Sequence, residues 1–236
     1  MKRFLLAVGL VALIALGAAA QYHYAFYYDT TGGQDLEINL INTVGFDNNY
    51  IITIYDANGV ELWSSFGTLD GNASAAAVVG PLVSGYDLAW GVVTVDTDYR
   101  MLIGLEYMLN GTLTSINTIY DEVPVLDPEV PFWLGAYYTQ YGTADTAFIL
   151  MNPWGVYASC SVTVHNSNGE VVYTQAFDLF PFESVYVNLS TVIGQGTMLW
   201  GLLDVRMEDA SVILALEYFR AEGTNLEVDN VTEYYF

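Results

Sequence analysis

Positive charge is almost missing from this chain of 236 residues. Five Lys and Arg side chains stand against 27 Asp and Glu, and the formal net charge is −22. Proteins that bind nucleic acid or anionic lipid neutralise phosphates with Lys and Arg. The composition therefore excludes nucleic acid and anionic membranes as partners, and it predicts a solvated acidic surface.

Cysteine and histidine are also scarce: the chain has only Cys160, His23 and His165. A single cysteine forms no intrachain disulfide, so the fold must rely on its hydrophobic core. The odd separation of Cys160 and His165 places them on opposite faces of a strand, which excludes a nucleophilic dyad, and the spacing matches no transition-metal site. We assign no catalytic residue and predict a protein that is not an enzyme. Cys160 is expected to be buried and His23 to lie in a frayed terminus.

The first twenty residues have the three parts of an export signal. Lys2 and Arg3 are positive, residues 4–16 are continuously apolar, and three alanines precede Gln21. This pattern is typical of a signal peptide cleaved before Gln21. The alternative is a retained anchor, because the apolar run approaches the roughly 17–25 residues that cross a bilayer. Cleavage predicts a secreted, periplasmic or cell-surface protein.

Repetition is the most informative feature of the chain. Five segments return 110 residues later: Tyr27-Tyr28 as Tyr137-Tyr138, Asn42 as Asn152, Gly45 as Gly155, Asn58-Gly59 as Asn168-Gly169, and Trp90-Gly91 as Trp200-Gly201. After one inserted residue, Leu105-Glu106-Tyr107 returns as Leu216-Glu217-Tyr218. A register kept over this distance indicates two homologous units in tandem. A duplicated unit is more typical of binding or assembly than of one catalytic site.

Both units read as short strands joined by turns. Apolar and polar residues alternate along residues 158–165, which is the pattern of a half-buried strand. Asn58-Gly59 and Asn168-Gly169 then predict hairpin turns, since Asn-Gly readily adopts positive φ. We predict an all-β protein of two tandem antiparallel β-sandwich domains with immunoglobulin-like architecture.

The domain boundary is predicted from composition. Residues 121–131 contain three prolines and four acidic side chains, which is typical of a semi-rigid extended linker. We therefore expect a signal peptide over residues 1–20, one β-sandwich over 21–120 and a second over 132–236.

The second unit resembles a family of uncharacterised secreted bacterial β-sandwich repeat proteins. The resemblance rests on an apolar-Asn-Pro segment at residues 149–153, a strand, the Asn-Gly turn, and a Pro-x-x-Ser segment at residues 181–184. The first unit matches more weakly, because Thr43 replaces the proline. The resemblance implies an exported, non-catalytic module and supplies no catalytic residues.

Calcium is the only cofactor that the sequence raises, through oxygen-rich pairs at Asp56 and Asn58 and at Asp96 and Asp98. A hairpin turn explains the first pair without a metal, and we favour that interpretation. Glu106 and Glu217 occupy the same place in both units, and we expect each to face solvent or to pair with an arginine such as Arg220. A catalytic carboxylate pair is the alternative, and it requires a separation of roughly 5–10 Å.

Aromatic residues are abundant, with 19 Tyr, 11 Phe and 5 Trp. Tyr and Trp on a sheet face stack on sugars or pack against proteins. We select Tyr28, Tyr138, Trp133 and Trp154 as candidate ligand-stacking residues. The repeated Trp90 and Trp200 are expected to be core anchors.

These features predict an exported, non-catalytic module for binding or assembly, in cell-surface structure or adhesion, with a protein or polysaccharide partner and with self-association as one mode. A carbohydrate-binding module that uses exposed Tyr and Trp is the alternative. A further alternative is an outer-membrane β-barrel, suggested by the tyrosines, the alternating strands and the terminal Phe236.

Overall fold

The structure is a computed structural model of the full chain. It describes residues 22–87, 89–124, 133–140, 144–194, 199–208, 210–220, 226–231 and 234–235. The predicted signal peptide and residues 125–131 of the predicted linker lie outside the described residues. No helix within the described ranges is long and apolar enough to cross a membrane.

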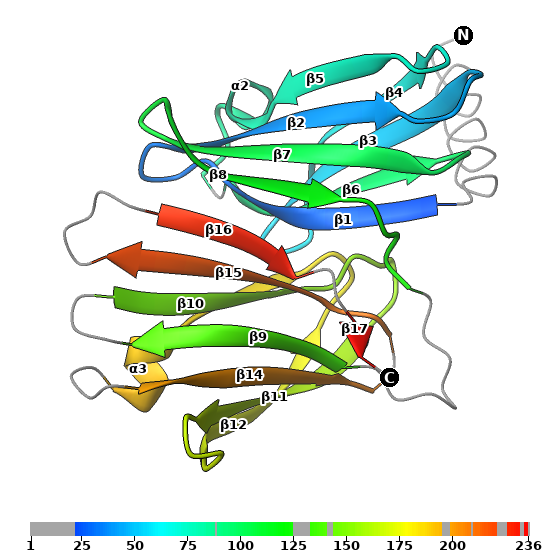
Figure 1. Ribbon diagram of the computed structural model, residues 1–236. Helices are drawn as coiled ribbons and strands as arrows, with labels where there is room; N and C mark the ends of the chain where they lie inside the picture. The colour runs from blue at the N-terminus through cyan, green and yellow to red at the C-terminus, as the bar shows by residue number, and fades with distance from the viewer. Residues whose placement is uncertain are drawn as a thin grey trace, which may run out of the picture.

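The first unit contains eight strands and one short helix (Figure 1). They are β1 (Tyr22–Asp29), β2 (Gln34–Asn42), β3 (Asn48–Asp56), β4 (Glu61–Leu69), β5 (Ser74–Val78), α2 (Val79–Val83), β6 (Trp90–Thr97), β7 (Met101–Leu109) and β8 (Thr112–Ile119). They form two antiparallel sheets, β1-β6-β3-β4 and β5-β2-β7-β8. We call the first the inner sheet of domain 1 and the second its outer sheet.

The second unit repeats this order. Its elements are β9 (Trp133–Gln140), β10 (Ala144–Met151), β11 (Ala158–Asn166), β12 (Val171–Leu179), β13 (Ser184–Asn188), α3 (Leu189–Ile193), β14 (Leu199–Met207), β15 (Ile213–Arg220), β16 (Leu226–Val231) and β17 (Tyr234–Tyr235). Sheet β13-β10-β15-β16 is the inner sheet of domain 2, and β12-β11-β14-β9-β17 is its outer sheet. The prediction of an all-β, tandem β-sandwich fold is confirmed.

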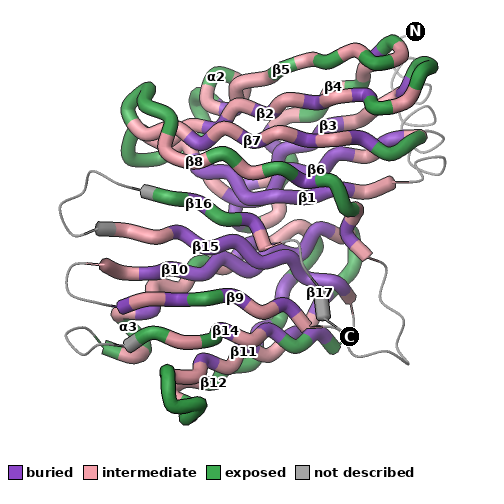
Figure 2. The backbone as a smooth tube through the Cα atoms, in the orientation of Figure 1, coloured by how far each residue is buried: buried purple, intermediate pink, exposed green. Residues whose placement is uncertain are grey.

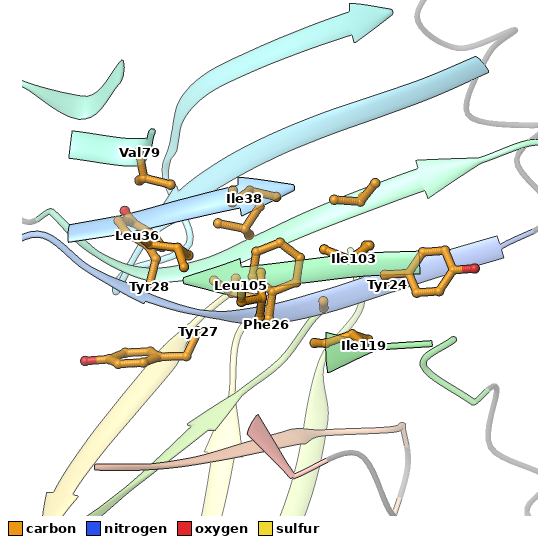
Figure 3. Packing of buried hydrophobic residues seen from close by; sticks show 14 of the residues in the cluster. Tyr24, Phe26, Tyr27, Tyr28, Leu36, Ile38, Val79, Ile103, Leu105 and Ile119 are labelled. Carbon is orange, nitrogen blue, oxygen red and sulfur yellow. The ribbon is translucent and has the colours of Figure 1, made fainter. Parts of the chain in front are cut away.

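Each sandwich is filled by every second residue of its strands. Along β2, Leu36, Ile38 and Leu40 are buried and their neighbours are partly exposed. Figure 3 shows the corresponding packing around Phe26 in domain 1. Cys160 is buried in the second core, as predicted, and burial raises the pKa of its thiol to about 12.

The repeated asparagines hold the same loop in each domain. The Asn42 side chain donates from Nδ2 to the carbonyls of Phe46, Leu69 and Asp70. Asn152 donates likewise to the carbonyls of residues 156, 179 and 180. Because a buried carbonyl without a partner is costly, one amide at this position secures three carbonyls in two loop segments, which accounts for its repetition.

The repeated glycines allow close backbone approach. A Cβ at Gly91 would lie 2.4 Å from the Tyr55 carbonyl oxygen, and one at Gly201 would lie 2.0 Å from the His165 carbonyl oxygen. Both contacts follow a bulge at the same place, in β3 and in β11. A side chain has no room at either position.

The two domains pack through their inner sheets. Strands β1, β10 and β15 are buried on both faces, and Figure 2 shows them as nearly continuous purple stretches. Ile149, Met151, Ile213 and Ala215 of domain 2 belong to the same hydrophobic cluster as the core of domain 1. The four sheets therefore follow one another as outer, inner, inner and outer layers.

Side chains of β8 also cover the edge strand β16. Ser115 Oγ contacts both the amide and the carbonyl of Val228, and Asn117 contacts the Val228 carbonyl and the Asn230 amide. These groups would otherwise form an open sheet edge.

Candidate functional site

The four calcium candidates do not come together. Asp56 Oδ1 accepts from the amides of Asn58 and Val60, which makes it part of the hairpin turn. Asp96 contacts His23 Nδ1 at 2.8 Å, and Asp98 accepts from the side-chain Nδ2 of Asn49. Within the described residues, no group of three or more His, Cys, Asp or Glu side chains is placed to hold a metal ion.

Tyr28 and Tyr138 are buried in the two cores, so neither is available to a ligand. Their neighbours Tyr27 and Tyr137 point out of the sandwiches instead, and Figure 3 shows Tyr27 on the opposite side of β1 from Tyr28. The choice of the second tyrosine in each pair was thus wrong. Successive side chains of a strand alternate between faces, and the sequence did not fix which face was the core.

Trp154 lies in the contact between the domains. Its ring stacks on His23 at 4.5 Å between centroids, and His23 Nε2 lies 3.0 Å from the Pro153 carbonyl oxygen. His23 is therefore held in β1 and not in a frayed terminus. Tyr55 and Phe182 stack beside them at 4.0 Å.

Glu217 is also in this contact, although the sequence predicted a solvent-facing or arginine-paired side chain. It is 1% exposed, and its Oε1 has no hydrogen-bond partner within the described residues. Burial, reinforced by the charge of Asp29, raises its pKa to about 7, while the hydroxyls of Tyr27 and Tyr186 act in the opposite direction. A catalytic pair with Glu106 does not form here, since Glu106 lies on the outer sheet of domain 1.

The outward surface of β9 and β14 is an exposed, largely apolar face that contains a groove. We call it the β9–β14 face, made of Trp133, Gly135, Tyr137, Trp200, Leu202 and Asp204. Tyr137 is 56% exposed, and Trp200 and Leu202 are each 47% exposed. A shallow groove of about 550 Å³ is lined by most of these residues. Of the four predicted stacking residues, only Trp133 lines this groove.

One carboxylate lies on this apolar face. Partial burial raises the pKa of Asp204, and the nearby His165 and Arg206 act in the opposite direction. The face thus offers aromatic rings for stacking and one oxygen pair that accepts hydrogen bonds. Among the described residues that line the groove, none is an acid–base partner for Asp204.

The repeat explains why sequence reasoning missed this face. Tyr27 is 0% exposed and Tyr137 is 56% exposed, although they occupy the same position. Trp200 is exposed likewise, so it is not a core anchor. Trp90 instead packs against the core cluster of domain 1 and lies edge-on to Tyr186. Domain 2 covers the first copy of this face, and the described chain leaves the second copy uncovered.

No protein-family model and no curated protein matches the chain. Among solved structures it is similar to the lectin of Pleurotus ostreatus in its apo form, with 9% identity over 89% of this chain and 74% of that one, at a TM-score of 0.26. The structure of the same lectin in complex with GalNAc is 10% identical over 89% of this chain and 75% of that one, at a TM-score of 0.26. A β-glucuronidase from glycoside hydrolase family 2 gives 11% identity over 88% of this chain and 23% of that one, at 0.21. Similarities at this level carry no argument about function.

Proposed function

We propose that this chain is an exported, non-catalytic module that works by docking its β9–β14 face onto another protein surface, as part of a cell-surface structure. The proposal combines the export signal with an aromatic face on a fold whose described acidic groups form no catalytic arrangement.

A single observation carries this proposal. The same face of domain 1 is already a docking surface, with Tyr27 fully buried against domain 2. The β9–β14 face keeps the tyrosine and tryptophan of that surface in exposed form. Exposed apolar patches of this kind are typical of interaction sites, and Tyr and Trp are the residues that contribute most to such contacts.

The test is a charge placed in the groove. Leu202→Asp sets a carboxylate beside Asp204, and we expect it to abolish self-association in sedimentation velocity and any retention on cell-surface material. Val156→Asp is the matched control, because Val156 is 59% exposed in a loop and does not line the groove. If Leu202→Asp retains all binding of the wild type, the β9–β14 face is not the binding surface.

A carbohydrate ligand is the second candidate, favoured by one feature of the groove. Trp133 and Tyr137 line it together with Asp204, and its volume is within the roughly 300–1,000 Å³ of small-ligand sites. Native gels containing a panel of polysaccharides, with and without calcium, test this. Retardation of the wild type that is lost in Trp133→Ala would establish sugar binding.

A further inference from the structure

The contact between the two domains uses one face of each. Domain 1 contributes the outward side of β1 and β6, including Tyr27, Trp90 and Val92. Domain 2 contributes the outward side of β10 and β15, including Ala215 and Glu217. The two faces are different, so the contact is heterologous.

Because the domains are repeats, each face has a second copy elsewhere in the chain. The second copy of the Tyr27 face is the β9–β14 face. The second copy of the Glu217 face lies on β2 and β7, where Glu37 pairs with Glu106 as Ala147 pairs with Glu217. We call it the β2–β7 face, made of Glu37, Asn39, Ile41, Leu102, Gly104 and Glu106, bordered by Ala76 and Ile116.

Exposure shows that this second face is uncovered as well. Val228 of β16 pairs with Glu217 and is 1% exposed, whereas Ile116 of β8 pairs with Glu106 and is 63% exposed. The apolar residue is therefore present at the same position in both copies, and only one copy has a partner within the described chain.

The tyrosine and the glutamate that meet in the contact between the domains also occur on the two uncovered faces. Tyr27 and Glu217 interact between the domains, and their repeat equivalents are Tyr137 and Glu106. Asp29, which adds a like charge next to Glu217, is replaced by Thr139. Glu37 stands beside Glu106 where domain 2 has Ala147, so the number of acidic side chains near this pair is unchanged.

The shapes of the open faces also correspond. Trp90 packs edge-on to Tyr186 of β13 at 6.1 Å. The equivalent of Tyr186 is Ala76, which pairs with Asn39 as Tyr186 pairs with Ile149. A small residue at this position leaves room for Trp200, and Gly104 replaces the buried Ala215 beside it.

We propose that the β9–β14 face of one molecule docks onto the β2–β7 face of a second copy, and that this contact repeats the one between domains 1 and 2. The inference rests on the proposed function and names its partner. A heterologous contact that does not close on itself generates a linear filament, in which the outer sheet of domain 2 of one molecule packs against the outer sheet of domain 1 of the next. The acidic chains repel one another, so assembly strengthens as salt screens their charge.

Two blocking variants test the proposal, with full-length chain produced in an exporting host. Leu202→Asp blocks the first face. Gly104→Gln blocks the second, and the free protein tolerates it because a Cβ at Gly104 would lie 3.5 Å from the Asn39 Cβ, an ordinary contact. Sedimentation velocity at rising salt should show wild type and the Val156→Asp control growing into larger species with concentration, and each blocking variant alone as a monomer.

Mixing the variants decides the geometry. Each keeps the face that the other lacks, so an equimolar mixture should form a dimer containing one copy of each and nothing larger.

If Gly104→Gln alone forms dimers while Leu202→Asp is monomeric, the β9–β14 face pairs with itself; the proposed function then stands and this inference falls. If wild type stays monomeric at every salt concentration, this inference falls, and retention on cell-surface material still tests the proposed function. If both variants assemble as wild type does, both fall. Monomeric wild type that polysaccharide retards overturns this inference in favour of a sugar ligand.

Discussion

At the scale of single residues, tyrosine hydroxyls fall into two groups: those that have a hydrogen-bond partner among the described residues and those that have none. The hydroxyls of Tyr28 and Tyr138 are buried without a hydrogen-bond partner among the described residues. In contrast, Tyr107 donates to the Tyr27 carbonyl at 2.6 Å and accepts from Asn230, and Tyr218 donates to the Tyr137 carbonyl. A buried polar group without a partner costs about 1–3 kcal/mol, so the two kinds of tyrosine should respond oppositely to loss of the hydroxyl.

We expect Tyr28→Phe to raise the free energy of unfolding by about 1 kcal/mol, because it removes an unsatisfied hydroxyl. Tyr107→Phe should lower it by about 1–3 kcal/mol, because it leaves the Tyr27 carbonyl and the Asn230 amide without this partner. Urea denaturation of the two variants side by side measures both. A loss of stability in Tyr28→Phe comparable to that in Tyr107→Phe would contradict the assignment.

Glu217 makes the domain contact dependent on pH. Its pKa rises from 4.5 to about 7 in the folded protein, so the folded state holds the proton more tightly than the unfolded state. Protonated Glu217 therefore contributes folding stability that is fully present below about pH 4.5. This contribution is lost as the pH rises to about 7, and above that pH the stability stays constant. The shift corresponds to about 3 kcal/mol.

The expected result is that Glu217→Gln, which resembles the protonated acid, is more stable than wild type at pH 8 and nearly equal to it at pH 5. Differential scanning calorimetry at both pH values gives the difference. Glu106→Gln is the control at the equivalent, partly exposed position, and it should show little change. A Glu217→Gln variant that parallels wild type at both pH values would place the carboxylate in a solvated environment.

At the scale of elements, alternation and turn residues predicted most strands. The strand predicted at residues 158–165 lies in β11, and Asn58-Gly59 and Asn168-Gly169 lie at the predicted hairpins, with φ of +77° and +80° at the glycines. Helices α2 and α3 were not predicted, since five residues are too short for a helical period to be visible. Local patterns thus predicted the strands and hairpin turns, and they did not predict the two five-residue helices.

The candidate site was less predictable, because it depends on which elements meet. Tyr27 and Tyr137 belong to equivalent strands, and Trp90 and Trp200 are equally repeated. One member of each pair is covered by the other domain and the other member is exposed. The sequence identifies the repeat but does not state which copy of a face is occupied. Glu217 was misassigned for the same reason, since its burial comes from a contact between sheets.

At the scale of the whole molecule, the shared cluster between the inner sheets makes the two sandwiches depend on each other. Residues of β10 and β15 complete the core around β1, so unfolding of domain 1 exposes apolar surface of domain 2. Interfaces of this kind couple the unfolding of neighbouring domains, as in repeat proteins. We therefore expect one calorimetric transition for the wild type.

The repeat provides a matched pair of variants for this coupling. Tyr27→Ala removes a fully buried ring from the domain contact and should destabilise by about 3–5 kcal/mol, which separates the calorimetric trace into two transitions. Tyr137→Ala changes the same position on the exposed face and should leave one transition within about 0.5 kcal/mol of wild type, while weakening assembly. If both variants keep a single, unshifted transition, the contact through Tyr27 contributes little to stability. Such a contact would then be too weak to serve as the template for a filament, because the intermolecular copy lacks the advantage of a shared chain.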